Sequence, residues 1–317
     1  MKRHCLTYLV FLFSIGNCFS SFLSVADTSG LNKLFSTGFA AIYNFKFHLA
    51  DSIAEELKEK FPMEEKTYLF IANSYWWKIR SGEDNANTRK QFMTALTSVE
   101  VLLDKKKRNE LSYEDLFNYI HVYSYMARLE LLDENYFNAF SYMNKCNMYL
   151  FTSFGKELSY EPFNLTTGLY NFYLVTGKQK YPPLIPFLML LPSADKEMGI
   201  KYLKRCSESS DENLQTEGNY FLMIIYGESD INYPLSADYS EKLCKKYPLN
   251  LLYRYYHFSV LLQDEKKDDA LVEYNQLYLS SIMNKELSSI QQKYFISLAQ
   301  KDLEKYYIKH PSKESRN

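Results

Sequence analysis

The sequence predicts an all-α protein whose antiparallel helix pairs stack as a solenoid. Apolar residues recur at helical spacing through almost the whole chain after residue 27, and sustained alternation with a period of two is absent. The 317 residues include only 10 glycines and 9 prolines, well under their usual combined share of about 12%. Helix pairs joined by short polar turns, repeated roughly every 30 to 40 residues, are typical of helical solenoids. Collagenous, low-complexity and turn-rich all-β classes are therefore excluded.

The charges of the chain are balanced. Lysine and arginine total 37, aspartate and glutamate total 38, and the formal net charge is −1. This balance gives no overall field that would draw the protein to nucleic acid or to an anionic lipid surface. We therefore expect no nucleic-acid partner.

The first 26 residues have the order of a secretory signal peptide. A short basic start, Lys2 and Arg3, precedes an apolar run over residues 5–15 that is too short for a membrane span. Three outcomes stay open: cleavage after Ala26 with soluble export, lipidation at Cys18 in a weak lipobox, and an uncleaved anchor. Each predicts an exported protein, periplasmic or envelope-associated in a bacterium, and the last two would tether it to the membrane.

Three cysteines remain after the signal segment, namely Cys146, Cys206 and Cys244. Their odd number and wide spacing, without a Cys-x-x-Cys pair, predict neither a disulfide framework nor a zinc site. We expect buried free thiols on helix faces. An export signal without a disulfide framework favours a bacterial envelope protein over a small secreted eukaryotic domain.

The predicted helices are bounded by prolines and by short polar segments. In one of them Leu49, Ile53 and Leu57 recur in steps of four on one face before Pro62 ends the helix. A polar tail over residues 309–317 is expected to be disordered. The first predicted helix closes over residues 40–47, and the others cover 48–61, 67–80, 88–105, 113–132, 136–151, 161–176, 194–205, 214–226, 235–247, 251–262, 267–283 and 287–307.

A turn followed by an alanine recurs four times along the chain. Ala50, Ala139, Ala237 and Ala270 occupy this place, where a small side chain would let two helix axes approach closely. The pattern resembles the tetratricopeptide-repeat superfamily over most of the chain after residue 26. The resemblance implies one domain over residues 27–308, a right-handed solenoid in which the first helix of each pair lines a concave surface.

The middle of the chain carries a narrower resemblance. Residues 167–173, the apolar loop that follows and residues 195–203 supply a Gly-x-Tyr-x-x-Tyr helix, a Leu-Pro loop and an Asp-x-x-x-Gly helix start. This block is similar to exported bacterial repeat proteins and to eukaryotic proteins of the tetratricopeptide repeat 39 kind. Residues 175–178 depart from the pattern, because a Leu-Pro is expected there. Such proteins generally carry no assigned chemistry, so the resemblance implies a fold and not a substrate.

Catalytic motifs are absent from the sequence. It contains no nucleophile elbow, phosphate loop, dinucleotide fingerprint or His-Glu-x-x-His helix. The five histidines are scattered, so a metal site would need ligands from distant segments. Paired carboxylates fit solvated helix faces, and the basic run at residues 105–108 fits a helix C-terminus. The sequence predicts a protein that is not an enzyme and that needs no metal or cofactor.

One loop, residues 182–192, contains four prolines and no charged residue, and its other members are all apolar. Its apolar members include Ile185, Phe187, Leu188 and Leu191. Two interpretations stay open. The loop is either a short apolar helix buried between repeats or an exposed patch for a partner, lipid or membrane surface.

Clusters of aromatic residues are candidates for a binding groove. Adjacent residues on a helix lie about a hundred degrees apart, so one buried face cannot absorb every ring of a cluster. Tyrosine, tryptophan and arginine are also the residues that most often dominate binding interfaces. The candidates are Trp76, Trp77, Tyr170, Tyr173, Arg254 and Tyr255. Packing between repeats is the competing interpretation for each of them.

These observations predict an exported, non-enzymatic helical-repeat protein that acts as a protein–protein interaction or assembly scaffold in the cell envelope. The identity of the protein partner and the oligomeric state are not predicted. The alternative is a protein that binds a small hydrophobic or glycan ligand in an aromatic-lined groove.

Overall fold

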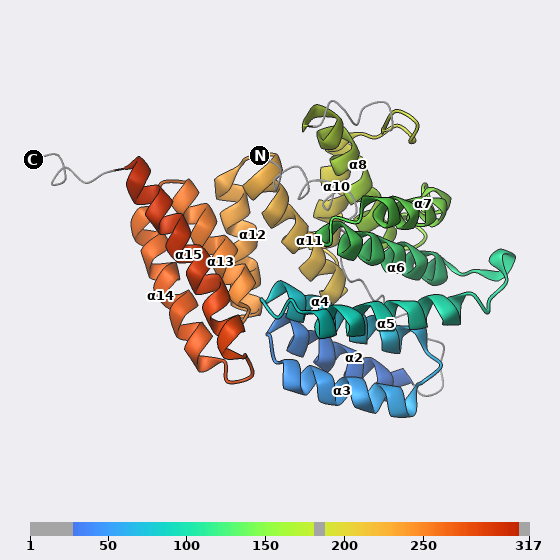
Figure 1. The fold of residues 1–317 in the computed structure, drawn as a ribbon. Helices are drawn as coiled ribbons and strands as arrows, with labels where there is room; N and C mark the ends of the chain where they lie inside the picture. Colours follow the sequence, from blue (N-terminus) through green and yellow to red (C-terminus); the bar gives the residue numbers. More distant parts are fainter. Residues whose placement is uncertain (1–27, 181–187, 311–317) are drawn as a thin grey trace, which may run out of the picture. The chain divides into compact units, whose positions relative to one another are not determined.

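The computed structural model describes residues 28–180 and 188–310 (Figure 1). These residues form α-helices, one 3-10 turn and one π-helical turn, and no strand occurs among them. The predicted signal peptide lies outside the described residues, as does the tail beyond residue 310. The all-α prediction is confirmed for the described part of the chain.

Most of the helices follow the predicted boundaries. The helices Tyr113–Leu132 and Lys267–Met283 have the bounds that the sequence predicts. The first helix begins at Thr28, well before residue 40, and ends at Tyr43. The helices are α2 (Thr28–Tyr43), α3 (Phe47–Lys60), α4 (Glu65–Arg80), α5 (Ala86–Leu103), α6 (Tyr113–Leu132), α7 (Tyr136–Ser153), α8 (Phe163–Lys180), α10 (Lys196–Ser207), α11 (Glu212–Ile224), α12 (Tyr233–Lys246), α13 (Leu251–Gln263), α14 (Lys267–Met283) and α15 (Ser289–Lys309).

The helix-to-helix turns repeat one backbone geometry three times. Phe45, Glu134 and Glu265 have φ values of 56°, 57° and 60°. Each donates its N–H to the carbonyl three residues earlier, and the next residue donates to the carbonyl five residues earlier. This is the Schellman arrangement, which usually has glycine at the left-handed position. These three turns are made without glycine, which accounts for part of the low glycine content, whereas the turn after α4 has the same two hydrogen bonds with Gly82 at the positive-φ position.

A small residue recurs at the fourth position of the second helix of the pairs. Ala50, Ala139, Gly199, Ser236 and Ala270 hold this place in α3, α7, α10, α12 and α14, and all five are buried. The sequence predicted Ala237 for α12, which is one residue late. Ser236 fits because its hydroxyl donates to the carbonyl of Met223 at 2.7 Å. α5 is the exception, since Arg89 stands fourth.

The described chain divides into two compact units. Unit 1 contains Lys58–Ala72 and Lys90–Leu222. Unit 2 contains Ser29–Leu57, Asn73–Arg89 and the described residues from Met223 onward. The helices α2, α3, α4, α5 and α11 contribute residues to both units.

Unit 1 is centred on α6, which is buried at 16 of its 20 residues. α6 packs on α7, and α8 packs on α10. The second contact depends on two glycines: a Cβ added to Gly199 would lie 2.7 Å from the backbone nitrogen of Phe172 and 2.8 Å from the carbonyl oxygen of Gly168. Asp195 begins α10 by accepting hydrogen bonds from the N–H groups of Glu197 and Met198. The Gly and Asp positions of the middle block thus have structural roles.

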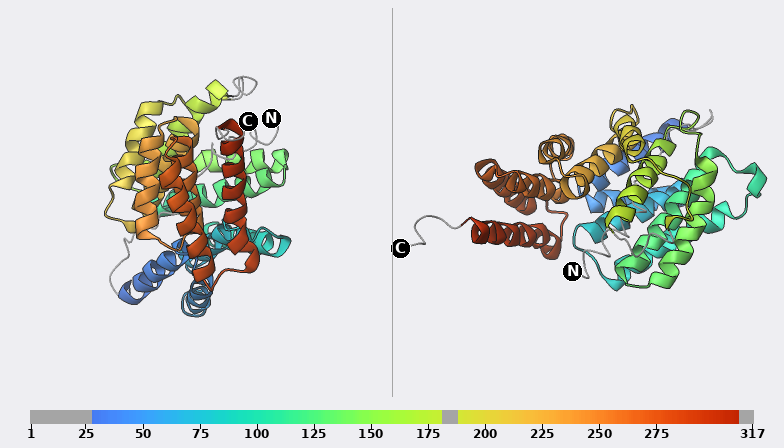
Figure 2. Two further views of the ribbon diagram at one scale, coloured as in Figure 1. Left: turned by 90° about the vertical axis from the view of Figure 1, so that its left-hand side faces the viewer. Right: turned by 90° about the horizontal axis from the view of Figure 1, so that it is seen from above.

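Unit 2 joins the first helices of the described chain to the last four. α12, α13, α14 and α15 lie side by side (Figure 2). Tyr43 at the end of α2 packs its ring against Trp77 and Tyr247, with centroids 5.6 and 5.1 Å apart. Asn250 donates to the carbonyl of Tyr43 at 2.8 Å, and Asn284 donates to the carbonyl of Phe45 at 3.3 Å. Residues more than 200 positions apart therefore share one core.

Candidate functional site

Four of the predicted groove residues lie in the cores of the units. Trp76 and Trp77 are buried in unit 2, and Tyr170 and Tyr173 are buried in unit 1. The ring of Trp77 makes edge contacts with Tyr43 of α2 and with Tyr253 of α13. Tyr170 donates to the carbonyl of Pro192 at 2.7 Å. These contacts support the packing interpretation for the four rings.

Arg254 and Tyr255 lie on α13 and are partly exposed. The guanidinium of Arg254 pairs with Glu273 of α14 at 2.9 Å. The hydroxyl of Tyr255 donates to Asp302 of α15 at 2.8 Å. Burial and the neighbouring carboxylate of Asp302 raise the pKa of Tyr255. Both side chains hold helices of unit 2 together, and their role in binding stays a prediction.

The predicted apolar loop is described only in part. Ile185 and Phe187 lie outside the described residues. Leu188 is buried and Leu191 is partly exposed, whereas Met189 and Leu190 between them are exposed. The two interpretations of this loop therefore both stay open.

The most regular polar arrangement of unit 1 is a seam along one face of α6. Asp115, Tyr119 and Tyr123 recur in steps of four on α6, so they share one face of the helix. Tyr119 donates to Asp104 at 2.8 Å, and Tyr123 donates to Glu100 at 2.8 Å. We call this row the α6 seam. Its partners come from the end of α5 and the loop after it, in antiparallel order.

The two tyrosines of the α6 seam are buried, and their hydroxyls donate to carboxylates. Burial, first, and the hydrogen bond to Asp104, second, raise the pKa of Tyr119. Burial and the hydrogen bond to Glu100 raise the pKa of Tyr123 in the same way. From α7, Tyr149 stacks on Tyr119 with centroids 4.1 Å apart and planes 6° apart. The seam thus binds α5, α6 and α7 to one another and keeps the hydroxyls protonated at neutral pH.

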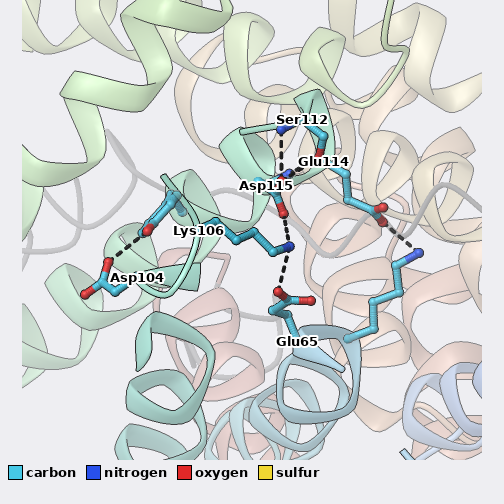
Figure 3. Close-up of polar contacts among 8 residues, drawn as sticks. Glu65, Asp104, Lys106, Ser112, Glu114 and Asp115 are labelled. Atoms are coloured by element: carbon cyan, nitrogen blue, oxygen red, sulfur yellow. Dashed lines mark hydrogen bonds and ion pairs between the residues drawn. The ribbon is translucent and has the colours of Figure 1, made fainter. Parts of the chain in front are cut away.

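A lysine stands at the other end of the α6 seam (Figure 3). Lys106 donates to Asp115 at 2.6 Å and pairs with Glu65 at 2.7 Å. Asp115 also caps α6, because its carboxylate accepts from the N–H and the hydroxyl of Ser112 at 2.9 and 2.8 Å. Burial opposes ionisation of Asp115, but these hydrogen bonds outweigh it and lower the pKa of the carboxyl.

The pKa of Lys106 is raised by the same network. Burial opposes the charge of the ammonium, but the hydrogen bonds to Asp115 and Glu65 outweigh it. Beside this network, Lys66 pairs with Glu114 at 2.7 Å. These groups already hold one another, so this end of the seam fixes the start of α6.

An exposed apolar patch lies at the turn between α6 and α7. Its members are Leu132, Tyr136, Phe137 and Phe140, and the side chain of Phe137 is 84% exposed. We call it the hairpin patch. The sequence marked Tyr136 and Phe137 as part of a repeat turn and missed their exposure. For Phe137 the spacing from the buried Ala139 is a signal that could have found it, since residues two apart on a helix do not share a face. Tyr136 stands three residues before Ala139, at the spacing of a shared face, so the sequence carried no such signal for it.

Metal ligands, apolar spans and cysteines are the remaining features of the described ranges that bear on function. Among these residues no group of three histidine, cysteine or carboxylate side chains could hold a metal ion. None of the described helices is both long and apolar enough to cross a membrane. Cys146, Cys206 and Cys244 are buried free thiols, as predicted, and burial raises the pKa of each. Such thiols are poor nucleophiles.

The sequence matches no protein-family model, and it matches no curated protein. The resemblance to tetratricopeptide repeats therefore stays a prediction.

Proposed function

We propose that this protein is an exported, non-enzymatic helical-repeat scaffold that binds a polypeptide partner in the cell envelope through the hairpin patch. A right-handed tetratricopeptide-like arrangement of its helix pairs is part of the proposal. The buried small residue at the fourth position of five second helices supports a true structural repeat. Export rests on the order of the first 26 residues, with lipidation at Cys18 as the alternative.

The observation that carries the proposal is the exposure of four large apolar side chains in one hairpin. Isolated exposed apolar residues are common, whereas clusters of them mark interaction sites. Two of the four are phenylalanines and one is a tyrosine, and aromatic residues are enriched in the cores of protein interfaces. The Schellman turn at Glu134 fixes the angle between α6 and α7 and so presents the patch on a rigid support.

Recovery of a partner from an envelope extract tests the proposal. Phe137→Ser should fold normally, because the side chain has few neighbours to lose, and should reduce the recovered partner at least about tenfold if Phe137 is a binding hot spot. Leu158→Ser is the matched control, since Leu158 is 92% exposed in the same unit and lies outside the hairpin patch. Equal recovery by the two variants would contradict the proposal. Mass spectrometry of the mature N-terminus separates cleavage after Ala26 from lipidation at Cys18.

One observation favours the alternative function, binding of a small hydrophobic or glycan ligand. A hollow of about 610 Å³ lies along α5 in unit 1. Met63, Tyr68, Met93 and Val101 contribute to its lining, with threonines and a serine between them. A ligand that binds only the folded state raises the melting temperature. A sugar or lipid that raises it in the wild type and not in Met93→Asp would establish this second function.

A further inference from the structure

Lys145 on α7 occupies a cage on the exposed side of the α6 seam. Its ammonium lies 4.9 Å from the ring centroid of Tyr123 and 5.8 Å from that of Tyr142. The same ammonium pairs with Glu100 at 3.1 Å. We call these three partners the Lys145 cage. Lys145 itself is about half exposed, so the occupant of the cage is open to solvent.

The cage has the chemistry that recognises a primary ammonium. Tyrosine ring faces attract cations, and a carboxylate beside them supplies the opposing charge. Tyr123 donates its hydroxyl to Glu100, which holds that carboxylate beside the ring. Parallel rings continue from the cage, because Tyr119 and Tyr149 each lie 6.0 Å from Tyr123 with nearly parallel planes. The site is preformed by contacts that do not involve Lys145.

The cage and its surroundings carry more negative charge than the ammonium of Lys145 neutralises. Asp104 on the segment after α5 accepts from Tyr119 and lies exposed near the stacked rings. Glu130 on α6 accepts hydrogen bonds from Asn135 and Asn138. Burial, first, and the charge of Glu130, second, raise the pKa of Tyr142. Arg108 and Lys145 are the two cations that act on Tyr149. Counting Glu100 in the cage with Asp104 and Glu130 beside it, three carboxylates thus stand against these two cations.

We infer that the Lys145 cage receives a lysine side chain of the partner polypeptide, with Lys145 as a built-in occupant that the partner displaces. This inference rests on the proposed function. The half-exposed Lys145 can swing into solvent while Tyr123, Tyr142 and Glu100 keep their places on three helices. The charge complementarity of the cage therefore selects basic partners over acidic ones.

Titration of the full chain with a tetralysine peptide at low ionic strength tests this inference. Lys145→Ala empties the cage and should bind the peptide about 3- to 10-fold more tightly than wild type, the range expected for one cation–ring contact. Lys201→Ala is the matched control, because it removes the same charge from an exposed position on α10. The gain should be much smaller in Lys201→Ala. It should be lost again when Tyr142→Ala or Glu100→Gln is added to Lys145→Ala.

Equal affinities of Lys145→Ala and Lys201→Ala would overturn the inference, since net charge alone would then explain the binding. Circular dichroism of each variant excludes loss of fold as the cause. The outcome is separable from that of the proposed function. If Phe137→Ser loses the partner and the cage variants do not change its recovery, the proposed scaffold function is supported and the inference about the cage is refuted. If Lys145→Ala binds tetralysine more tightly but no partner is recovered from the extract, only the proposed scaffold function is refuted.

Discussion

At the scale of single residues, His121 is the group whose environment matters most and could not be predicted from the sequence. The sequence showed only that the five histidines are scattered. In the structure His121 is buried in α6, between the rings of Phe117 and Tyr125, with centroids 6.0 and 4.8 Å away. Its Nε2 has no hydrogen-bond partner among the described residues. Periodicity could place His121 on a helix but could not show that every face of that helix is covered.

His121 should make the stability of the protein depend on pH. Burial, first, and the nearby Arg128, second, lower the pKa of His121 to about 3, against about 6.5 in an unfolded chain. The unfolded state therefore takes up a proton as the pH falls below about 6.5 while the folded state does not. The resulting stability is present above that pH and is lost as the pH falls toward 3. Between pH 7 and pH 5 the free energy of unfolding should fall by about 2 kcal/mol from this group alone.

Chemical denaturation at the two pH values measures this contribution. His121→Gln keeps a polar side chain of similar length that does not titrate, so its free energy of unfolding should fall by about 2 kcal/mol less than that of wild type over the same interval. His257→Gln is a useful comparison. Burial also lowers the pKa of His257, but this histidine is partly exposed and its Nδ1 contacts the hydroxyl of Ser240. An unchanged pH dependence in His121→Gln would show that the imidazole is solvated in the folded state.

At the scale of elements, helices were predictable and their contacts were only partly so. Helical periodicity gave the bounds of α6 and α14 because polar turns frame both. It missed the beginning of α2, where small and polar residues at positions 28–30 and 36–38 dilute the apolar pattern. The small-residue rule found Ala50, Ala139 and Ala270. It missed Ser236, because a hydroxyl is acceptable in a core only when a carbonyl lies within reach, and that depends on the neighbouring helix.

The contact between α8 and α10 allows a sharp test of the small-residue rule. Gly199→Ala places a methyl group against backbone atoms of Phe172 and Gly168, which cannot rotate away as a flexible side chain could. We expect the free energy of unfolding to fall by about 1–3 kcal/mol, the usual cost of overpacking. Gly30→Ala is the control, since a Cβ there would have no neighbour within 4 Å. Gly30 is the third residue of α2, so that change should stabilise by at most about 0.5–1 kcal/mol, the value for a helix interior. A Gly199→Ala variant as stable as wild type would show that the two helices can separate at little cost.

The candidate site was less predictable than the helices, because it depends on how neighbouring helices are aligned against one another. The α6 seam requires the register of α5 against α6, and the Lys145 cage requires that of α7 as well. A sequence fixes which residues share one helix face, but it does not fix the sliding position of one helix against another. Tyr170 and Tyr173 were chosen as groove residues because they are aromatic and clustered. Both are buried in the structure, and the ring of Tyr170 packs against those of Phe151 and Phe154.

At the scale of the whole molecule, local repeats do not explain how unit 2 is assembled. In an open solenoid each repeat contacts its neighbours, so the ends of the chain are independent. In unit 2, α2 shares a core with α13, and three side chain–backbone hydrogen bonds join the segment around residues 43–48 to α13 and to the turn after α14. Sequence periodicity indicates contacts between helices that are neighbours along the chain, and it cannot reveal the contact between α2 and α13.

Asn250 is the residue on which this long-range contact can be tested. It is fully buried, donates to the carbonyl of Tyr43 at 2.8 Å, and accepts from the N–H groups of Leu252 and Tyr253 at the start of α13. Asn250→Ala removes a helix cap and leaves a buried carbonyl without its donor. The free energy of unfolding should therefore fall by about 2–4 kcal/mol.

The location of the effect distinguishes a shared core from a local cap. Hydrogen exchange should become faster in Asn250→Ala not only at the start of α13 but also at the end of α2, some 200 residues away in the sequence. Asn232→Ala is the matched control, because Asn232 caps α12 at an exposed position and donates nothing to α2 among the described contacts. That variant should lose only about 1 kcal/mol and leave exchange in α2 unchanged. Faster exchange confined to α13 in Asn250→Ala would mean that the hydrogen bond from Asn250 does not couple the two ends of the described chain, and that ring contacts such as those of Tyr43 with Trp77 and Tyr247 suffice to hold α2.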